Sequence, residues 1–239
     1  LRVLRQVDHL ITVSPLQEKL FSGIYEGSKI SMIPEAVPSS YFVDKPFFAN
    51  DGRLKILFIG RIVEEKGIKE LLYAVGEISK MGDDKVELRC IGPDFGYLRE
   101  ALRIIEDLNL KGAVNMLGPL PEDQKIGNLD WCDVLVLPSY YEAFGLPVVE
   151  AMARGKPVIA TKTVGCMSLV RHNETGFLVE CGDSGDIANM LTRFLKDPNL
   201  KYQMGEKALK HAIHFSMQDM VGNHMQLYQD LVTANLRKL

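Results

Sequence analysis

The stretch LKILFIGRIVEEKG, residues 54–67, decides the fold class of this chain. Its first part, residues 54–59, is apolar apart from Lys55, which is typical of a short strand buried on both faces of a parallel sheet. Gly60 allows a tight turn, and a segment with helical periodicity then runs from residue 68 to about residue 80. A buried strand that leads through a short turn into a helix is the repeating unit of α/β folds.

The same unit recurs along most of the chain. Short apolar runs rich in Val, Ile and Leu alternate with segments of helical periodicity. This alternation predicts an α/β fold with a doubly wound, Rossmann-like parallel sheet. The predicted strands are residues 54–59, 86–91, 114–117, 134–137, 157–160 and 176–179, and the predicted helices between them are residues 68–80, 97–109, 122–129 and 148–154.

The two flanks of this central region follow a different pattern. Residues 8–34 predict a strand, a helix and a second strand, with Ser14 as the helix N-cap and Gln17 at the capping-box position. Residues 34–52 contain three prolines and no regular period, so we interpret them as a linker. After residue 183 the pattern predicts an amphipathic helix followed by two further helical segments.

The composition argues against several classes of partner. Lys and Arg number 28 against 31 Asp and Glu, so the net charge of -3 gives no reason to expect nucleic acid or an anionic membrane as the main partner. No apolar stretch approaches the roughly 20 residues that cross a bilayer. The four cysteines show no CxxC spacing and no signal peptide precedes them, so we expect a cytoplasmic protein.

Two cations follow the strand at residues 54–59. Arg61 and Lys66 lie between its carboxyl end and the next helix, which is where open α/β sheets bind ligands. A phosphate at the start of a helix gains from the helix dipole and from unpaired N–H groups, and two cations would neutralise a diphosphate. The alternative, for this stretch taken by itself, is that both cations form weak surface pairs with Glu64 and Glu65.

A second candidate binding segment is PSYYEAFGLPVVEA, residues 138–151, directly after the predicted VLVL strand. Gly145 lets backbone N–H groups approach a ligand closely, and Pro147 suits a first helical turn. Glu142 in the loop and Glu150 in the early helix could accept hydrogen bonds from sugar hydroxyls. The alternative for Glu150 taken by itself is a favourable charge near a helix N-terminus.

Taken together, these motifs resemble those of the retaining, GT-B-fold glycosyltransferases of group 1, also called family four. The family signature of Glu, seven residues and Glu reads EAFGLPVVE from Glu142 to Glu150. The resemblance covers roughly residues 8–200. Supporting motifs occur in the family's order: GRx4KG at residues 60–67, an NLG-like segment at 116–118, WCDVLVLPS at 131–139, ARGKPVIA at 153–160 and TGFLV at 175–179.

The resemblance implies a role for each matched position. Arg61 and Lys66 would bind the diphosphate of a nucleotide-sugar donor (a UDP-, GDP- or ADP-sugar) and, with Glu142, would be the catalytic residues. Glu150 would accept hydrogen bonds from the ribose. No prosthetic group is implied, and the sequence has no Asp-x-Asp pair or histidine cluster that indicates a metal. The remaining donor-binding positions are Phe144, Gly145 and Leu146, which would hold the sugar and its phosphate, and Gly92 and Leu120, where the family places the base.

The resemblance also implies a domain organisation, in which this chain is the C-terminal half of a GT-B fold. Residues 1–42 would be the end of the N-terminal, acceptor-binding domain and the linker, and residues 43–200 the nucleotide-sugar-binding domain. Residues 201–239 would be helices that cross back toward the N-terminal domain. Most of that domain would be missing, so we expect the isolated chain to be inactive. The implied acceptor is a glycan or a lipid-linked glycan, and any peripheral membrane association would come through the missing domain.

Two segments depart from the family pattern, and two other functions stay open besides a rival that the sequence argues against. The linker reads IPEAV at residues 33–37 instead of IPNGV, and residues 164–168 read VGCMS instead of GGxxE, which leaves sugar and acceptor preference undecided. An NAD-dependent dehydrogenase would need a GxGxxG turn, which is absent. The other two alternatives are a nucleotide-sugar epimerase of related fold and a non-catalytic donor-binding module.

Overall fold

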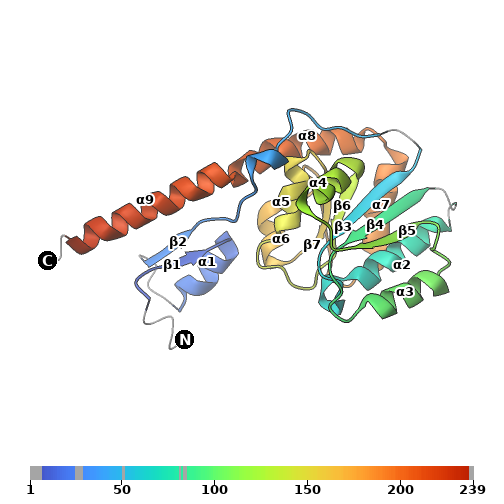
Figure 1. The fold of residues 1–239 in the computed structure, drawn as a ribbon, viewed down its shortest axis with the longest axis horizontal. Coiled ribbons are helices and arrows are strands. Elements are labelled where there is room, and N and C mark those ends of the chain that lie inside the picture. The colour runs from blue at the N-terminus through green and yellow to red at the C-terminus, as the bar shows by residue number, and fades with distance from the viewer. Residues whose placement is uncertain (1–6, 25–28, 50–51, 81, 83–84, 237–239) are drawn as a thin grey trace.

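The computed structural model describes residues 7–24, 29–49, 52–80, 82 and 85–236, and Figure 1 shows a small N-terminal βαβ unit beside a large α/β unit. The βαβ unit comprises β1 (Leu10–Thr12), α1 (Pro15–Ser22) and β2 (Ile30–Met32), and the linker after it contains the 3-10 helix η3 (Ser39–Tyr41). The large unit contains, in chain order, β3 (Leu54–Ile59), η4 (Glu64–Lys66), α2 (Ile68–Ser79), β4 (Val86–Ile91), α3 (Leu98–Asp107), β5 (Val114–Gly118), α4 (Glu122–Trp131), β6 (Val134–Leu137), α5 (Leu146–Ala153), β7 (Val158–Thr161), α6 (Val164–Leu169), β8 (Gly176–Val179), α7 (Ser184–Lys196) and α8 (Leu200–Ala212). The chain ends with η5 (Ile213–Phe215) and α9 (Met217–Leu236).

The large sheet of the described chain has six parallel strands in the order β5-β4-β3-β6-β7-β8. The chain starts in the middle at β3, builds outward to β5, and returns to the other side of β3 with β6, where Leu57 pairs with Leu135. This order confirms the doubly wound sheet, and it reverses direction between β3 and β6. Because all the strands are parallel, the loops that follow β3 and β6 lie next to each other at the carboxyl edge.

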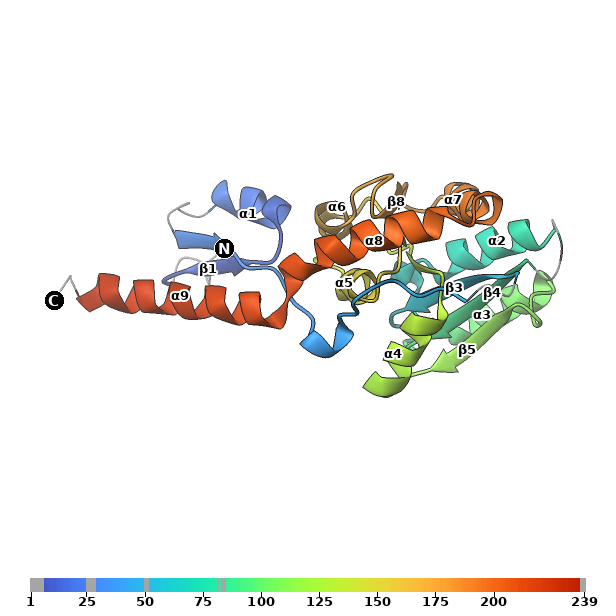
Figure 2. The same cartoon turned by 90° about the horizontal axis from the view of Figure 1, so that it is seen from above.

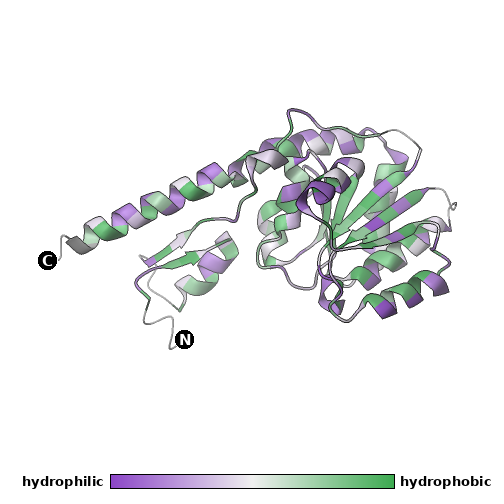
Figure 3. Cartoon of the chain, viewed as in Figure 1, coloured by the Kyte–Doolittle hydropathy of each residue, from purple (hydrophilic) through white to green (hydrophobic). Residues whose placement is uncertain are grey.

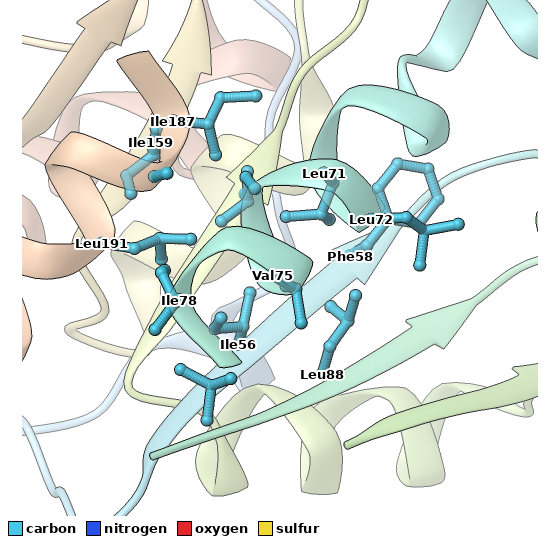
Figure 4. Packing of buried hydrophobic residues seen from close by; sticks show 14 of the residues in the cluster. Ile56, Phe58, Leu71, Leu72, Val75, Ile78, Leu88, Ile159, Ile187 and Leu191 are labelled. Atoms are coloured by element: carbon cyan, nitrogen blue, oxygen red, sulfur yellow. The ribbon is translucent and has the colours of Figure 1, made fainter. Parts of the chain in front are cut away.

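Side chains that alternate along β3 build a core on each face of the large sheet. Ile56 and Phe58 belong to the core under α2, α3 and α7, part of which Figure 4 shows from close by. Leu57 and Ile59 belong to the opposite core, under α4, α5 and α6. Apolar strands therefore lie between helices whose polar residues face outward, as Figure 3 shows. Burial on both faces explains why β3, β6 and β7 are nearly continuous apolar runs. β4 and β5, toward one edge of the sheet, alternate buried with less buried positions.

The small βαβ unit has the predicted cap at the start of its helix. β1 and β2 pair in parallel, with Leu10 opposite Ile30. The Ser14 hydroxyl accepts a hydrogen bond from the Gln17 backbone N–H at 3.3 Å, and the Gln17 side chain accepts one from the Val13 N–H at 3.2 Å. The first bond satisfies an N–H group at the helix start that has no partner within the helix. The second reaches the N–H of Val13, one residue before the N-cap Ser14 whose N–H a capping box would bond.

The C-terminal helices connect the large unit to the region of the small one. The Lys201 ammonium in α8 lies 2.7 Å from the buried Asp133 carboxylate, which fixes α8 to the large unit. From there α9 runs past the βαβ unit, as Figures 1 and 2 show from two directions. The Val37 N–H in the linker donates to the Phe215 carbonyl at 3.0 Å, and the Met217 N–H donates to the Val37 carbonyl at 3.1 Å. The linker and the start of α9 therefore lie side by side.

The ends of the predicted central strands agree with the structure to within one residue. The helix α6, by contrast, was not predicted, because its six residues are too few to show helical periodicity. Its N-cap is Thr163, whose side chain accepts a hydrogen bond from the Cys166 N–H. Among the helices that the structure describes, none has both the length and the apolar character needed to cross a membrane.

Candidate functional site

The turn after β3 is folded tightly against the end of β6. Gly67 has a φ of 68°, and a Cβ at this position would lie 2.1 Å from the Pro138 carbonyl oxygen. A residue with a side chain would clash there, so glycine lets the turn pass the end of β6 before α2 begins. The Tyr140 N–H also donates to the Glu65 carbonyl at 2.9 Å. The loops on either side of the point where the strand order reverses therefore form one surface.

Lys66 and Glu142, one from each of these loops, form an ion pair on this surface. The Lys66 Nζ contacts the Glu142 Oε1, and the Ser139 hydroxyl donates to the same carboxylate oxygen at 3.1 Å. The two charged side chains are 15% and 13% exposed. Salt screens such a sheltered pair less than it screens exposed charges. The structure thus brings together two residues that the motifs placed 76 positions apart.

Backbone contacts on two sides hold the segment around Glu142. The Gly165 N–H, at the start of α6, donates to the Glu142 carbonyl at 2.9 Å. The Gln17 side-chain amide, from α1 in the βαβ unit, donates to the Ala143 carbonyl at 3.2 Å. Because two other elements hold this segment, the Glu142 side chain has a defined position. Neither contact was predicted from the sequence.

The chain changes direction at Gly145 to begin α5. Phe144, just before it, is buried in the core on that face of the sheet. Gly145 has a φ of 101°, a left-handed conformation that residues with a Cβ rarely adopt. Leu146 is the first residue of α5. The positive end of this helix and its first N–H groups therefore lie at the carboxyl edge, and the helix begins four residues after Glu142.

Glu150, in the second turn of α5, is 5% exposed. The Lys125 Nζ donates a hydrogen bond to its Oε1 at 2.9 Å. Lys125 also lies 3.0 Å from Glu122, and its ammonium lies 5.4 Å from the centre of the Tyr41 ring. Burial raises the pKa of the Glu150 carboxyl, and the Lys125 ammonium opposes that shift. Glu150 is thus the innermost member of a polar cluster built from the linker, α4 and α5.

Arg61 lies in a more open environment than Lys66. Its Nη2 is 2.9 Å from the Glu65 carboxylate, and the two side chains are 48% and 56% exposed. Its guanidinium also lies 5.1 Å from the centre of the Phe95 ring. For Arg61, this is the weak surface pair that the sequence analysis gave as the alternative to binding a phosphate.

The two positions that the resemblance assigned to the base follow adjacent strands. Gly92 comes directly after β4, and its N–H donates to the carbonyl of Gly118, the last residue of β5, at 2.9 Å. Leu120 follows two positions later and packs, partly buried, against the core under α4 and α5. Both positions lie at the carboxyl edge of the sheet, on the β5 side of β3.

The described residues offer no group of three or more His, Cys, Asp and Glu side chains that could hold a metal ion. A buried thiol, that of Cys166, packs against the segment at residues 142–150. Its Sγ would lie 3.5 Å from a Cβ built on Gly145. Burial raises the pKa of the Cys166 thiol to about 12, so it is neutral at physiological pH and a weak nucleophile.

Known protein sequences place this arrangement in a family. The family model described as glycosyl transferases group 1 matches residues 42–211. D-inositol 3-phosphate glycosyltransferase of Corynebacterium jeikeium is 34% identical over 191 residues, which cover 77% of this chain and 46% of that protein. N-acetyl-alpha-D-glucosaminyl L-malate synthase of Bacillus anthracis is 29% identical over 189 residues, covering 79% of this chain and 48% of that protein. The chain therefore spans about half the length of these curated relatives.

Solved structures share the fold. Sucrose-phosphate synthase from Thermosynechococcus elongatus superposes with a TM-score of 0.86 at 28% identity, covering 98% of this chain and 60% of that one. Anabaena Alr3699/HepE, solved in complex with UDP and glucose, superposes with a TM-score of 0.80 at 22% identity, covering 95% of this chain and 64% of that one. The family match includes both the turn at residues 60–67 and the segment at residues 142–150. The chain belongs to the group 1 glycosyl transferase family.

Proposed function

We propose that this chain carries the donor site of a glycosyltransferase that moves a sugar from a nucleotide-diphosphate sugar to an acceptor. The observation that carries the proposal is the Lys66–Glu142 pair at the point where the strand order reverses. Open α/β sheets bind ligands at this point, and the pair offers a cation for the diphosphate beside a carboxylate for sugar hydroxyls. Membership of the group 1 family supports the same activity.

The proposed chemistry uses charges that are in place before the reaction. Transfer breaks the bond between the sugar C1 and the diphosphate, so negative charge grows on the leaving group while positive charge develops on the sugar ring. Lys66 and the first N–H groups of α5 would stabilise that negative charge more in the transition state than in the bound donor, which lowers the barrier. Arg61 would join them by exchanging the Glu65 carboxylate for a phosphate.

The remaining polar groups would hold the donor. Glu142, with its Oε1 fixed by Lys66 and Ser139, would accept hydrogen bonds from the sugar. Glu150 would accept them from the ribose, and the base would lie near Gly92 and Leu120. The family resemblance implies that the anomeric configuration is retained, with the departing diphosphate assisting removal of the acceptor proton.

The domain organisation belongs to the same proposal. Residues 43–200 would be the donor-binding domain, residues 1–42 the end of the acceptor-binding domain with the linker, and residues 201–239 the returning helices. A glycan or lipid-linked acceptor would bind mainly to protein outside this chain. We therefore expect the 239-residue chain to bind the donor without transferring its sugar.

Calorimetric titration with UDP, GDP and ADP tests the proposal. We expect one of the three to bind at micromolar concentration and the others more weakly, and UDP is the first to test because Alr3699/HepE was solved with it. Lys66→Ala should weaken that binding strongly, because it removes the sheltered cation. Lys111→Ala, which removes a cation that is 69% exposed, is the matched control. If none of the three nucleotides binds the wild-type chain, the proposal is wrong.

A further inference from the structure

Lys125 is a largely buried cation that none of the family motifs accounts for. It lies in the first turn of α4, and its side chain is 19% exposed. Its Nζ is 2.9 Å from the Glu150 carboxylate in α5 and 3.0 Å from the Glu122 carboxylate in its own helix. An ammonium held between carboxylates from two elements has a defined position, and it fixes the carboxylates in return.

Glu150 needs a partner of this kind. A carboxylate that is 5% exposed loses most of its hydration, and its charged form is stable only with a nearby cation or hydrogen-bond donor. The titratable groups that face it are Lys125 and Glu122 from α4 and Tyr41 from the linker. Burial and Glu122 raise the pKa of the Glu150 carboxyl, whereas Lys125 and Tyr41 lower it. Among these three residues, Lys125 supplies the positive charge.

The charge on Glu150 matters for the ligand proposed there. A ribose presents two neighbouring hydroxyl groups, and an ionised carboxylate can accept a hydrogen bond from each of them. A protonated carboxyl loses part of that acceptor capacity and adds a donor. The hydrogen bond from Lys125 to Oε1 also restricts rotation of the carboxylate plane, so it defines the direction in which the acceptor oxygens point.

We propose, on the basis of the donor site proposed above, that Lys125 is a positioning residue that orients the Glu150 carboxylate for the ribose hydroxyls. Tyr41 completes the arrangement from the linker. Its hydroxyl donates to Glu122, and its ring lies 5.4 Å from the Lys125 ammonium. Lys125 would thereby set the preference of this site for ribonucleotides over nucleotides that lack the ribose hydroxyls.

The first test needs no nucleotide. The Glu150 carboxyl carbon is followed by NMR during an acid titration of the wild type, Lys125→Met, Lys125→Arg and the control Lys111→Met. We expect Lys125→Met to move the titration midpoint upward, Lys125→Arg to restore it, and Lys111→Met to leave it unchanged. Because Arg keeps the charge, it separates loss of the cation from any general effect of substitution on folding. An unchanged midpoint in Lys125→Met overturns the inference.

The second test compares UDP with 2′,3′-dideoxyuridine diphosphate by calorimetry, or the guanosine or adenosine pair if the wild type prefers that base. In Lys125→Met the preference for the ribonucleotide should fall about tenfold, as expected for loss of one charge-assisted hydrogen bond. Equal weakening of both nucleotides would indicate a general structural role and overturn the inference while leaving the proposed function intact. If the wild type binds neither nucleotide of any pair, the proposed function fails, and the ribose role of Lys125 fails with it.

Discussion

The side-chain amide of Gln17 donates a hydrogen bond to the backbone carbonyl of Ala143 at 3.2 Å. Gln17 belongs to α1 of the βαβ unit, whereas Ala143 directly follows Glu142 in the loop after β6. The same glutamine accepts a hydrogen bond from the Val13 N–H at 3.2 Å, so both ends of its amide group are engaged. The βαβ unit therefore contacts the segment that we propose holds the donor.

We predict that Gln17→Glu weakens binding of the nucleoside diphosphate while leaving the helix cap in place. A glutamate can still accept from the Val13 N–H, but it cannot donate to Ala143, and it adds a negative charge near the proposed diphosphate. The expected loss in binding free energy is about 1 kcal/mol, the net value of one hydrogen bond. Calorimetry measures it, and thermal unfolding checks that the fold is unchanged. Equal affinities of variant and wild type would contradict the prediction.

Lys66→Ala should slow sugar transfer about a hundred- to a thousand-fold when it is introduced into a protein that also contains the acceptor-binding domain proposed above. Removal of one preorganised cation that stabilises the leaving group raises the barrier by about 2.7–4 kcal/mol, judged from oxyanion-site deletions in other enzymes. Lys69→Ala is the matched control, because Lys69 is an exposed lysine three residues further along the same segment. Initial rates at saturating donor measure the effect. Normal turnover in Lys66→Ala would remove Lys66 from the proposed site.

Arg61→Ala separates the two interpretations of the Arg61–Glu65 pair. Exposed pairs of this kind contribute about 0.2–1 kcal/mol to stability, so the free energy of unfolding in urea should change little. If Arg61 exchanges Glu65 for a phosphate, affinity for the nucleoside diphosphate should nevertheless fall. Arg103→Ala removes another exposed, paired arginine and should change neither quantity. Unchanged affinity in Arg61→Ala would show that Arg61 belongs to a surface pair.

Glu150 should make stability depend on pH with a defined sign. Burial raises the pKa of its carboxyl in the folded state above the unfolded value of about 4.3, so the folded protein binds more protons in the window just above that pH. The contribution of Glu150 to stability is therefore present below the unfolded pKa and is lost as pH rises through the folded pKa. Glu150→Gln lacks this titration. Relative to the wild type, the variant should gain stability as pH rises above the unfolded pKa of about 4.3 and through the folded pKa.

Urea unfolding at several pH values tests this prediction, with the result expressed as the difference between variant and wild type at each pH. The difference removes contributions that the two proteins share, such as that of the Glu106 carboxyl, whose pKa is lowered by its hydrogen bond with Lys111. Glu87→Gln, which removes a partly buried carboxylate that is paired with Arg89 and lies outside the Glu150 cluster, is a matched control. A difference that is constant or decreases with rising pH would contradict the prediction.

The parts of this molecule that could be predicted are those whose cause is local. The strand at residues 54–59 is apolar apart from Lys55 because both of its faces are buried, and Ser14 caps α1 by bonding the N–H of Gln17, three residues later. Lys66 and Glu142 could be assigned to one edge because parallel strands end on the same side. That they touch depends on β3 lying next to β6, and the strand order is not readable from periodicity.

The parts that could not be predicted involve partners far apart in the chain. The Glu122–Lys125 spacing is that of a helical ion pair, but nothing in the sequence indicates that Lys125 also reaches Glu150, 25 positions later. The second hydrogen bond of Gln17 spans 126 positions. The first contact depends on how α4 and α5 pack on the large sheet, and the second on how the βαβ unit lies against the loop after β6. The sequence pattern leaves both undetermined.

The paired course of the linker and the start of α9 has a mechanical consequence. Val37 forms a parallel bridge with Ser216, so two backbone segments pass side by side between the two parts of the chain. Two backbone segments that are hydrogen-bonded to each other resist twisting along their length more than a single segment does. They can still bend. Any displacement of one part relative to the other would therefore have to bend both segments together, and it would act directly on the Gln17–Ala143 hydrogen bond.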